Sequence, residues 1–213
     1  MKLLVLGGNG RTGRLVVERA LAAGHTVTAF SRDPSKVKLS DERLSIVNGD
    51  ARYISDLNAA LKGQDAVINT IGGGERKLIE KTTTSLLTAM RESGVKRVVY
   101  MSTFIATPNF KPSGTMRLFP RLVRGMAQDD LAGVRLVEGS DLEWTIVYAT
   151  ILKNKPGADF RPVGPDEILT AKNFVNRAAV AECLLEAVTD RATIGQALLI
   201  TGAGERIAAE PGS

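Results

Sequence analysis

The 213-residue chain is 44% hydrophobic and has 28 Lys+Arg against 23 Asp+Glu, a net charge of +5. This size and apolar content predict one compact domain, residues 1–204, followed by a disordered tail, 205–213. The mild positive charge would attract small anions as readily as nucleic acid, so it identifies no partner. A single cysteine, Cys183, excludes an internal disulfide and favours the reducing cytoplasm. The apolar run Lys2–Leu6 is too short for a secretory signal or a membrane span.

Short apolar runs rich in β-branched residues alternate with longer helical patterns along the whole chain. The predicted strands are Lys2–Leu6, Thr26–Ser31, Leu44–Asn48, Ala66–Ile71, Arg97–Ser102, Glu143–Tyr148 and Ala197–Ile200. The predicted helices are Thr12–Ala23, Asp56–Leu61, Lys77–Ser93, Asp129–Gly139 and Asn173–Thr189. This alternation is typical of βαβ units. We therefore predict an α/β fold of the Rossmann type, doubly wound, with a mainly parallel sheet of about seven strands and helices on both faces.

Two stretches, Phe104–Gln128 and Lys153–Pro165, interrupt this rhythm with prolines and glycines. Long loops at the carboxyl ends of parallel strands often build a substrate pocket. The first stretch holds four basic residues with no acid between them: Lys111, Arg117, Arg121 and Arg124. It also holds four large apolar residues: Phe104, Phe110, Met116 and Phe119. The basic residues could attract an anionic ligand or form a solvated face, and the apolar residues could line a pocket or anchor the loop.

A glycine-rich turn follows the first predicted strand directly and opens the first predicted helix. Its pattern is Gly7-x-x-Gly10-x-x-Gly13. A pyrophosphate needs backbone N–H donors at close range and gains from the positive end of a helix, so the turn must lack Cβ atoms. We predict a dinucleotide site formed by Gly7, Asn9, Gly10, Arg11, Thr12 and Gly13, with Gly13 allowing close helix packing. The alternative is a loop of ordinary glycines.

The second predicted strand ends at Ser31 and is followed by Arg32, where NAD-binding relatives of this fold carry an acid on the ribose hydroxyls. A guanidinium there can bind a 2′-phosphate through a fork of hydrogen bonds, with Ser31 as a helper. This favours NADP(H) over NAD(H). The neighbouring Asp33 leaves a second interpretation open, because it could bind the ribose if the register shifts by one residue. Asp33-Pro34 is more simply interpreted as the start of a turn.

Two further strand ends supply cofactor-binding candidates. Asp50 and Ala51 follow the third predicted strand, where Asp50 could bond the adenine edge or serve only as a turn aspartate. Ile71 and Gly72 lie at the end of the fourth predicted strand, before two more glycines. These glycines could allow close passage of a ligand or form a flexible loop.

The motifs together resemble the atypical short-chain dehydrogenases with an NAD(P)-binding, NmrA-like fold, and within them the biliverdin-IXβ reductase/flavin reductase branch. The stretches that carry the resemblance are Gly7–Gly13, Gly24–Thr28, Ser31–Pro34, Gly49–Ala51, Gln64–Ile68, Ser93–Val99, Ser102–Thr103 and Gly139–Val147. The resemblance implies that Ser102 and Thr103 lie beside the nicotinamide and that the chain near Tyr148 passes its carboxamide. Tyr148-Ala149 departs from the Arg-Pro of relatives, and the loop after Thr103 is unusually basic.

No tyrosine of the chain is followed four residues later by a lysine, so the pair that protonates a carbonyl oxygen in alcohol–ketone chemistry is absent. The one histidine, His25, falls in a predicted helix-to-strand turn, and one His with one Cys cannot build the usual nitrogen and sulfur metal sites. These absences favour hydride transfer to a conjugated acceptor, a flavin, quinone or linear tetrapyrrole, with Ser102 and Thr103 as catalytic candidates.

We therefore expect an NADPH-dependent oxidoreductase acting on a small conjugated molecule that could be anionic. We expect no metal, no nucleic-acid or membrane partner, and a monomer or small homo-oligomer. Two alternatives remain open from the residues: a non-catalytic NADP(H) sensor of the NmrA-like kind, and an isomerase or tailoring enzyme on the same fold.

Overall fold

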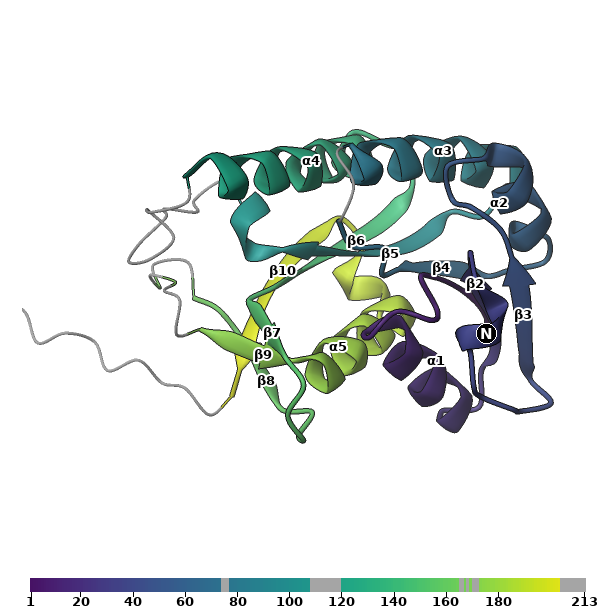
Figure 1. Cartoon of the computed structure of the whole chain (residues 1–213), viewed down its shortest axis with the longest axis horizontal. Coiled ribbons are helices and arrows are strands. Elements are labelled where there is room, and N and C mark those ends of the chain that lie inside the picture. The colour runs from purple at the N-terminus through teal and green to yellow at the C-terminus, as the bar shows by residue number, and fades with distance from the viewer. Residues whose placement is uncertain (74–76, 108–119, 165–166, 168, 170–172, 204–213) are drawn as a thin grey trace, which may run out of the picture.

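The computed structural model describes residues 1–73, 77–107, 120–164, 167, 169 and 173–203 (Figure 1). Its strands are β1 (Lys2–Leu6), β2 (Thr26–Ser31), β3 (Leu44–Asn48), β4 (Ala66–Asn69), β5 (Arg97–Thr103), β6 (Glu143–Ala149), β7 (Ile151–Lys153), β8 (Phe160–Pro162), β9 (Phe174–Asn176) and β10 (Gln196–Gly202). Eight of them form one sheet in the order β3-β2-β1-β4-β5-β6-β10-β8. All neighbours pair in parallel except β10 and β8, and β7 pairs with β9 in a separate small sheet.

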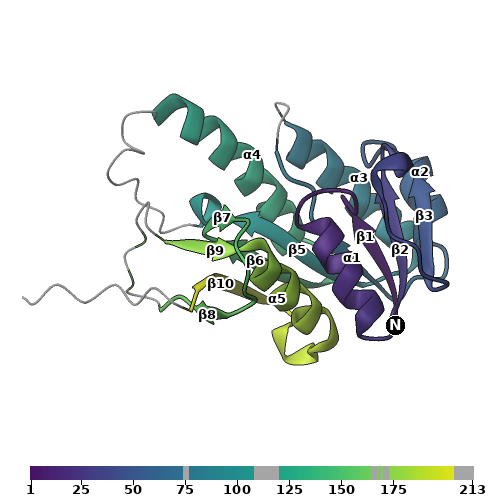
Figure 2. The same cartoon turned by 60° about the horizontal axis from the view of Figure 1, so that its bottom comes forward.

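Helices cover both faces of the main sheet. The helices α1 (Gly13–Ala22) and α5 (Arg177–Thr189) lie side by side on one face, where Arg19 Nε donates to Glu182 Oε2 at 2.8 Å (Figure 2). The helices α2 (Ile54–Leu61), α3 (Leu78–Ser93) and α4 (Pro120–Glu138) cover the other face (Figure 1). The doubly wound α/β prediction is therefore confirmed.

The central strands form the core because they present apolar side chains to both helical layers. All four residues of β4 are buried, as are Leu3 to Leu6 of β1. Strand β3 lies at the sheet edge and leaves Ile46 partly exposed. Burial of each large aliphatic side chain stabilises the fold by about 1.5–3 kcal/mol, so the strands with continuous apolar runs occupy the centre.

Several predicted boundaries were wrong. Helix α4 begins at Pro120, inside the stretch Phe104–Gln128 that we predicted to be irregular, because proline is tolerated in the first turn of a helix. The predicted helix Asn173–Thr189 begins only at Arg177, since Phe174–Asn176 pair with β7. The main sheet has eight strands rather than about seven, because β8 adds an antiparallel edge that three residues were too few to signal.

Smaller differences affect the strand and helix ends. Strand β4 ends at Asn69 rather than Ile71, β5 and β6 each extend one residue further, and α2 begins at Ile54. No helix in the described part of the chain is long and apolar enough to cross a membrane. The predicted tail 205–213 lies outside the described residues.

The thiol of Cys183 is buried in α5, and burial raises its pKa to about 12. We expect the folded protein to react with an aromatic disulfide reagent at least about 100-fold more slowly than the unfolded chain, because only the thiolate attacks. The reaction can be followed by absorbance with and without denaturant. Equal rates in the two states would contradict the buried placement.

Candidate functional site

The carboxyl ends of β1 and β4 diverge at the centre of the sheet. Strand β1 leads into α1 on one face, and β4 leads towards α3 on the other face (Figure 1). Such a switch point leaves a crevice outside the carboxyl ends of the strands, where ligands of doubly wound folds bind. The glycine-rich turn lies at this position.

The backbone of the turn is closed by a short hydrogen bond and leaves no room for a side chain at Gly13. The N–H of Gly10 donates to Gly7 O at 2.8 Å, and Gly7 has a φ of +77°, a conformation that favours glycine. A Cβ on Gly13 would lie 2.2 Å from Gly7 O and 2.7 Å from Thr70 Oγ1. The predicted close packing at Gly13 is therefore present, and a glycine is required there.

Thr70 joins the two diverging strands and was not among the predicted site residues. Its Oγ1 donates to Leu6 O at 2.8 Å, so the hydroxyl holds the end of β4 against the end of β1. Its position directly before Ile71 and three glycines was visible in the sequence, but the strand pairing that gives it this role was not.

A cleft of about 180 Å³ opens beside the turn. Nine predicted cofactor-binding residues line it: Gly7, Asn9, Gly10, Ser31, Arg32, Asp50, Ala51, Ile71 and Gly72. Five further residues complete the lining: Phe30, Gly49, Thr70, Leu78 and Thr82. The predicted residues Arg11, Thr12, Gly13 and Tyr148 are not part of this lining. The cleft thus joins the ends of β1, β2, β3 and β4 to the first turn of α3.

Among the described residues that line the cleft, one is an exposed cation, Arg32. Arg32 lines the cleft and forms no ion pair with a described residue. The acids near Arg32, Asp33 and Asp50, both bond to other side chains. Asp33 accepts from Ser35 Oγ at 2.6 Å and from Lys36 Nζ at 2.9 Å. Asp33 directly precedes a short 3-10 turn, Pro34–Lys36. The interpretation of Asp33-Pro34 as the start of a turn therefore agrees with the structure.

Asp50 is engaged in the same way. Its carboxylate accepts hydrogen bonds from the side-chain and backbone nitrogens of Arg52, and this interaction lowers the pKa of Asp50. Asp50 is therefore paired mainly with Arg52, and a smaller Coulombic attraction to Arg32 also lowers its pKa. Ser31 is almost fully buried, and its Oγ accepts a hydrogen bond from the backbone N–H of Asp33 at 3.1 Å.

The catalytic candidates Ser102 and Thr103 lie at the carboxyl end of β5, next to β4. Ser102 is 5% exposed, and its Oγ has no hydrogen-bond partner in the described part of the chain. Thr103 Oγ1 donates to Asp130 Oδ2 of α4 at 2.7 Å. Asp130 was missed by the sequence reasoning, which placed it at the start of a helix rather than in its middle.

The tyrosines of the neighbouring strands are buried in the core. Tyr100 shares a hydrogen bond of 2.7 Å with Thr83, and burial raises its pKa far above the ordinary range. Tyr148 is 4% exposed among the apolar residues beneath α3 and α4, and burial raises its pKa to about 12. His25 Nδ1 lies 3.2 Å from the terminal amine of Met1, at the amino ends of β1 and β2 and so away from the cleft.

A family model described as NAD(P)H-binding matches residues 7–191. This chain belongs to the NAD(P)H-binding family. The matched range includes the glycine turn, the whole of the cleft and both catalytic candidates. The cofactor class expected from the turn is therefore confirmed.

Related proteins share most of the length of this NAD(P)H-binding chain. An uncharacterized chloroplastic protein of Arabidopsis thaliana is 29% identical over 203 residues, which cover 88% of this chain and 71% of that protein. A short-chain dehydrogenase/reductase of Veillonella parvula, solved in complex with NADP, has a TM-score of 0.79 and 19% identity, over 95% of both chains. An anaerobilin reductase of Escherichia coli O157:H7 has a TM-score of 0.78 and 20% identity, over 98% of this chain and 100% of that one.

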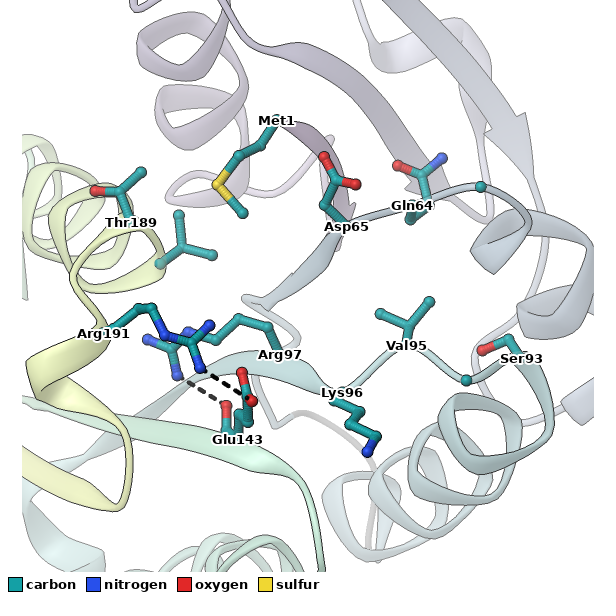
Figure 3. A pocket seen from close by; sticks show the side chains of 13 residues that line it. Met1, Gln64, Asp65, Ser93, Val95, Lys96, Arg97, Glu143, Thr189 and Arg191 are labelled. Atoms are coloured by element: carbon teal, nitrogen blue, oxygen red, sulfur yellow. Dashed lines mark hydrogen bonds and ion pairs between the residues drawn. The ribbon is translucent and has the colours of Figure 1, made fainter.

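The larger cavity of this NAD(P)H-binding protein, about 520 Å³, lies at the amino ends of the strands, away from the glycine turn (Figure 3). Several of its charged side chains bond to one another or to backbone, and Asp65 accepts from the backbone N–H of Lys2 at 2.7 Å. Arg97 and Arg191 both reach Glu143, with Arg97 donating to the backbone carbonyl at 2.8 Å and Arg191 lying 3.3 Å from the carboxylate (Figure 3). We therefore place the functional site at the smaller cleft.

The predicted acceptor-binding loop is only partly described. Lys111, Arg117, Phe110, Met116 and Phe119 lie outside the described residues, as do the side chains of Arg121 and Arg124. Phe104 is 4% exposed, which agrees with the interpretation that it anchors the loop to the core. No cluster of three metal-ligating side chains occurs among the residues that the structure describes.

Proposed function

We propose that the protein binds NADP(H) across the switch point and reduces a conjugated small-molecule acceptor, such as a flavin, a quinone or a linear tetrapyrrole. The observation that carries this proposal is the charge pattern of the cleft. Arg32 lies open in it, whereas Asp33 and Asp50 are engaged by neighbouring side chains. A 2′-phosphate would supply an ion-pair partner for Arg32, whereas both carboxylates that could bind an NAD ribose already bond to neighbouring side chains.

The chain offers each part of a dinucleotide a matching group. The turn from Gly7 to Gly13 would present backbone N–H groups at the start of α1 to the pyrophosphate, and Arg11 and Thr12 belong to this turn. Asn9 lies between the turn and the loop after β2, since its Nδ2 is 3.5 Å from Asp33 O. Ile71 and Gly72 follow β4, which neighbours β5, so a cofactor that contacts them would extend towards the end of β5. A bound reduced nicotinamide supplies a hydride.

Ser102 and Thr103 would orient the nicotinamide and the acceptor at the end of β5. The buried Ser102 hydroxyl needs a hydrogen-bond partner, and the nicotinamide carboxamide would provide one. Tyr100 and Tyr148 are poor proton donors at neutral pH, because both are buried with raised pKa values. This favours acceptors whose conjugated system stabilises the charge that follows hydride addition. The fold shared with the anaerobilin reductase of Escherichia coli O157:H7 is compatible with the same choice.

The test is NADPH oxidation measured by absorbance, with FMN, a simple quinone and biliverdin as acceptors, together with NADPH binding measured by titration calorimetry. We expect tight NADPH binding and turnover with at least one acceptor. Tight binding with no turnover above the uncatalysed rate for any acceptor would contradict the reductase assignment and favour the sensor.

A further inference from the structure

Two consecutive aspartates in the middle of α4 make different contacts. Asp129 accepts from the backbone N–H of Ile79 at 3.2 Å and of Glu80 at 3.0 Å, so it caps the start of α3. Asp130 accepts from Thr103 Oγ1 at 2.7 Å instead. The first aspartate therefore has a structural role, and the second contacts a candidate catalytic hydroxyl.

The surroundings of Asp130 contain hydroxyls and acids and no paired cation. Its side chain is half-buried, and desolvation raises its pKa although the Thr103 hydrogen bond opposes this shift. Among the described titratable groups, Asp129 of α4 raises the pKa of Asp130, and Asp130 in turn raises the pKa values of Tyr100 of β5 and Tyr148 of β6. No basic side chain in the described ranges pairs with it. A carboxyl in such a place holds a proton to higher pH than an exposed aspartate does.

We propose that Asp130 supplies, through the Thr103 hydroxyl, the proton that the acceptor takes up after hydride transfer. This inference rests on the proposed reductase function and deepens it. Asp130 is here a positioning and proton-relay residue, because it acts on the acceptor through Thr103. The short contact between Asp130 and Thr103, at the strand end next to the buried Ser102 hydroxyl, carries the proposal.

The step balances as follows. The acceptor receives a hydride as NADPH becomes NADP⁺, and it is left as an anion. The Thr103 hydroxyl gives its proton to this anion while it takes the proton of the Asp130 carboxyl. The reduced acceptor leaves neutral, and the Asp130 carboxylate regains a proton from solvent.

The acceptors differ in how much they need this proton. A reduced quinone or tetrapyrrole must be protonated for the charge to be removed, whereas a flavin reduced by hydride is stable as an anion at neutral pH. Loss of the relay should therefore slow quinone and biliverdin reduction and spare FMN reduction. A purely structural loss would slow all three together.

The kinetic test compares Asp130→Asn with Asp129→Asn across acidic and neutral pH. Asparagine can still accept the Thr103 hydrogen bond but has no proton to give. We expect Asp130→Asn to lower kcat for the quinone about 100-fold, and to abolish its decline with rising pH, while kcat for FMN changes less than about threefold. Asp129→Asn should keep the wild-type pH profile.

Two variants of Thr103 separate the relay from packing. Thr103→Val removes the hydroxyl and should abolish the pH dependence of quinone reduction as Asp130→Asn does, whereas Thr103→Ser keeps the hydroxyl and should restore both the pH dependence and most of the rate. Equal losses with quinone and FMN, or an unchanged pH profile in Asp130→Asn, would overturn the relay while leaving the reductase function intact. If the wild-type protein reduced none of the acceptors, both the relay and the proposed reductase function would be wrong.

Stability supplies a readout that needs no cofactor. The raised pKa means that the folded protein keeps the Asp130 proton at pH values where the unfolded chain has lost it, so stability falls as pH rises through that range. Asp130→Asn should therefore unfold at a higher temperature than wild type at neutral pH, with the difference vanishing below the ordinary aspartate pKa. Asp129→Asn should unfold at a lower temperature, because the cap on α3 is weakened. If Asp130→Asn were less stable than wild type at neutral pH, the Asp130 carboxylate would be ionised in the folded protein, and the proposed proton relay would be wrong.

Discussion

Replacing Gly13 with alanine is expected to weaken NADPH binding at least about 100-fold and to destabilise the protein by about 2–3 kcal/mol. The added Cβ would lie 2.2 Å from Gly7 O and 2.7 Å from Thr70 Oγ1, far inside van der Waals contact. The turn must then shift, and the amides that face the pyrophosphate shift with it. Titration calorimetry with NADPH and urea unfolding measure the two losses.

The matched control is Gly125→Ala. Gly125 lies within α4, and a Cβ there meets no atom within 4 Å. Alanine should stabilise the helix by up to about 1 kcal/mol and leave NADPH binding unchanged. If Gly13→Ala bound NADPH as tightly as the wild type, the turn would not be the cofactor cradle.

Arg32→Glu is expected to weaken NADPH binding about 100-fold or more, and NADH binding less than about threefold. Each hydrogen bond between charged groups contributes about 1.5–3 kcal/mol, and the substituted carboxylate would also repel the 2′-phosphate. The dissociation constants of both cofactors, measured by the quenching of protein fluorescence, give the comparison directly.

A charge-matched control is available in Arg43→Glu. Arg43 pairs with Asp41 before β3 and does not line the cleft. This variant changes the net charge by the same amount and should leave the ratio of NADPH to NADH affinity unaltered. Equal losses for both cofactors in Arg32→Glu would show that this guanidinium does not recognise the phosphate.

The parts of the fold that were predictable depend on local patterns. The strands of the sheet centre carry continuous apolar runs, and the glycine turn carries a steric requirement that shows in the residue types themselves. Gly13 illustrates this, because the nearest atom that a Cβ there would meet belongs to Gly7, only six residues earlier in the chain. Both signals exist before any long-range packing is known.

The parts that were missed depend on contacts between distant residues. The role of Asp130 arises from Thr103, 27 residues earlier, after α4 has packed on the end of β5. Strand β9 exists because Ile151–Lys153 lie beside it, although its own sequence runs on into a helix. The beginning of α4 at Pro120 was hidden by the Pro, Gly and Arg content that favoured a loop.

The adjacent contacts of Asp129 and Asp130 tie the two halves of the site to one turn of α4. Asp129 caps the start of α3, whose Leu78 and Thr82 line the cleft, while Asp130 accepts from Thr103 on the side where we propose that the acceptor binds. Any insertion or deletion that rotates this turn would displace both contacts at once. In the divergence of such proteins, cofactor affinity and acceptor choice cannot drift independently through this helix, so new acceptor specificities should arise in the loops around it.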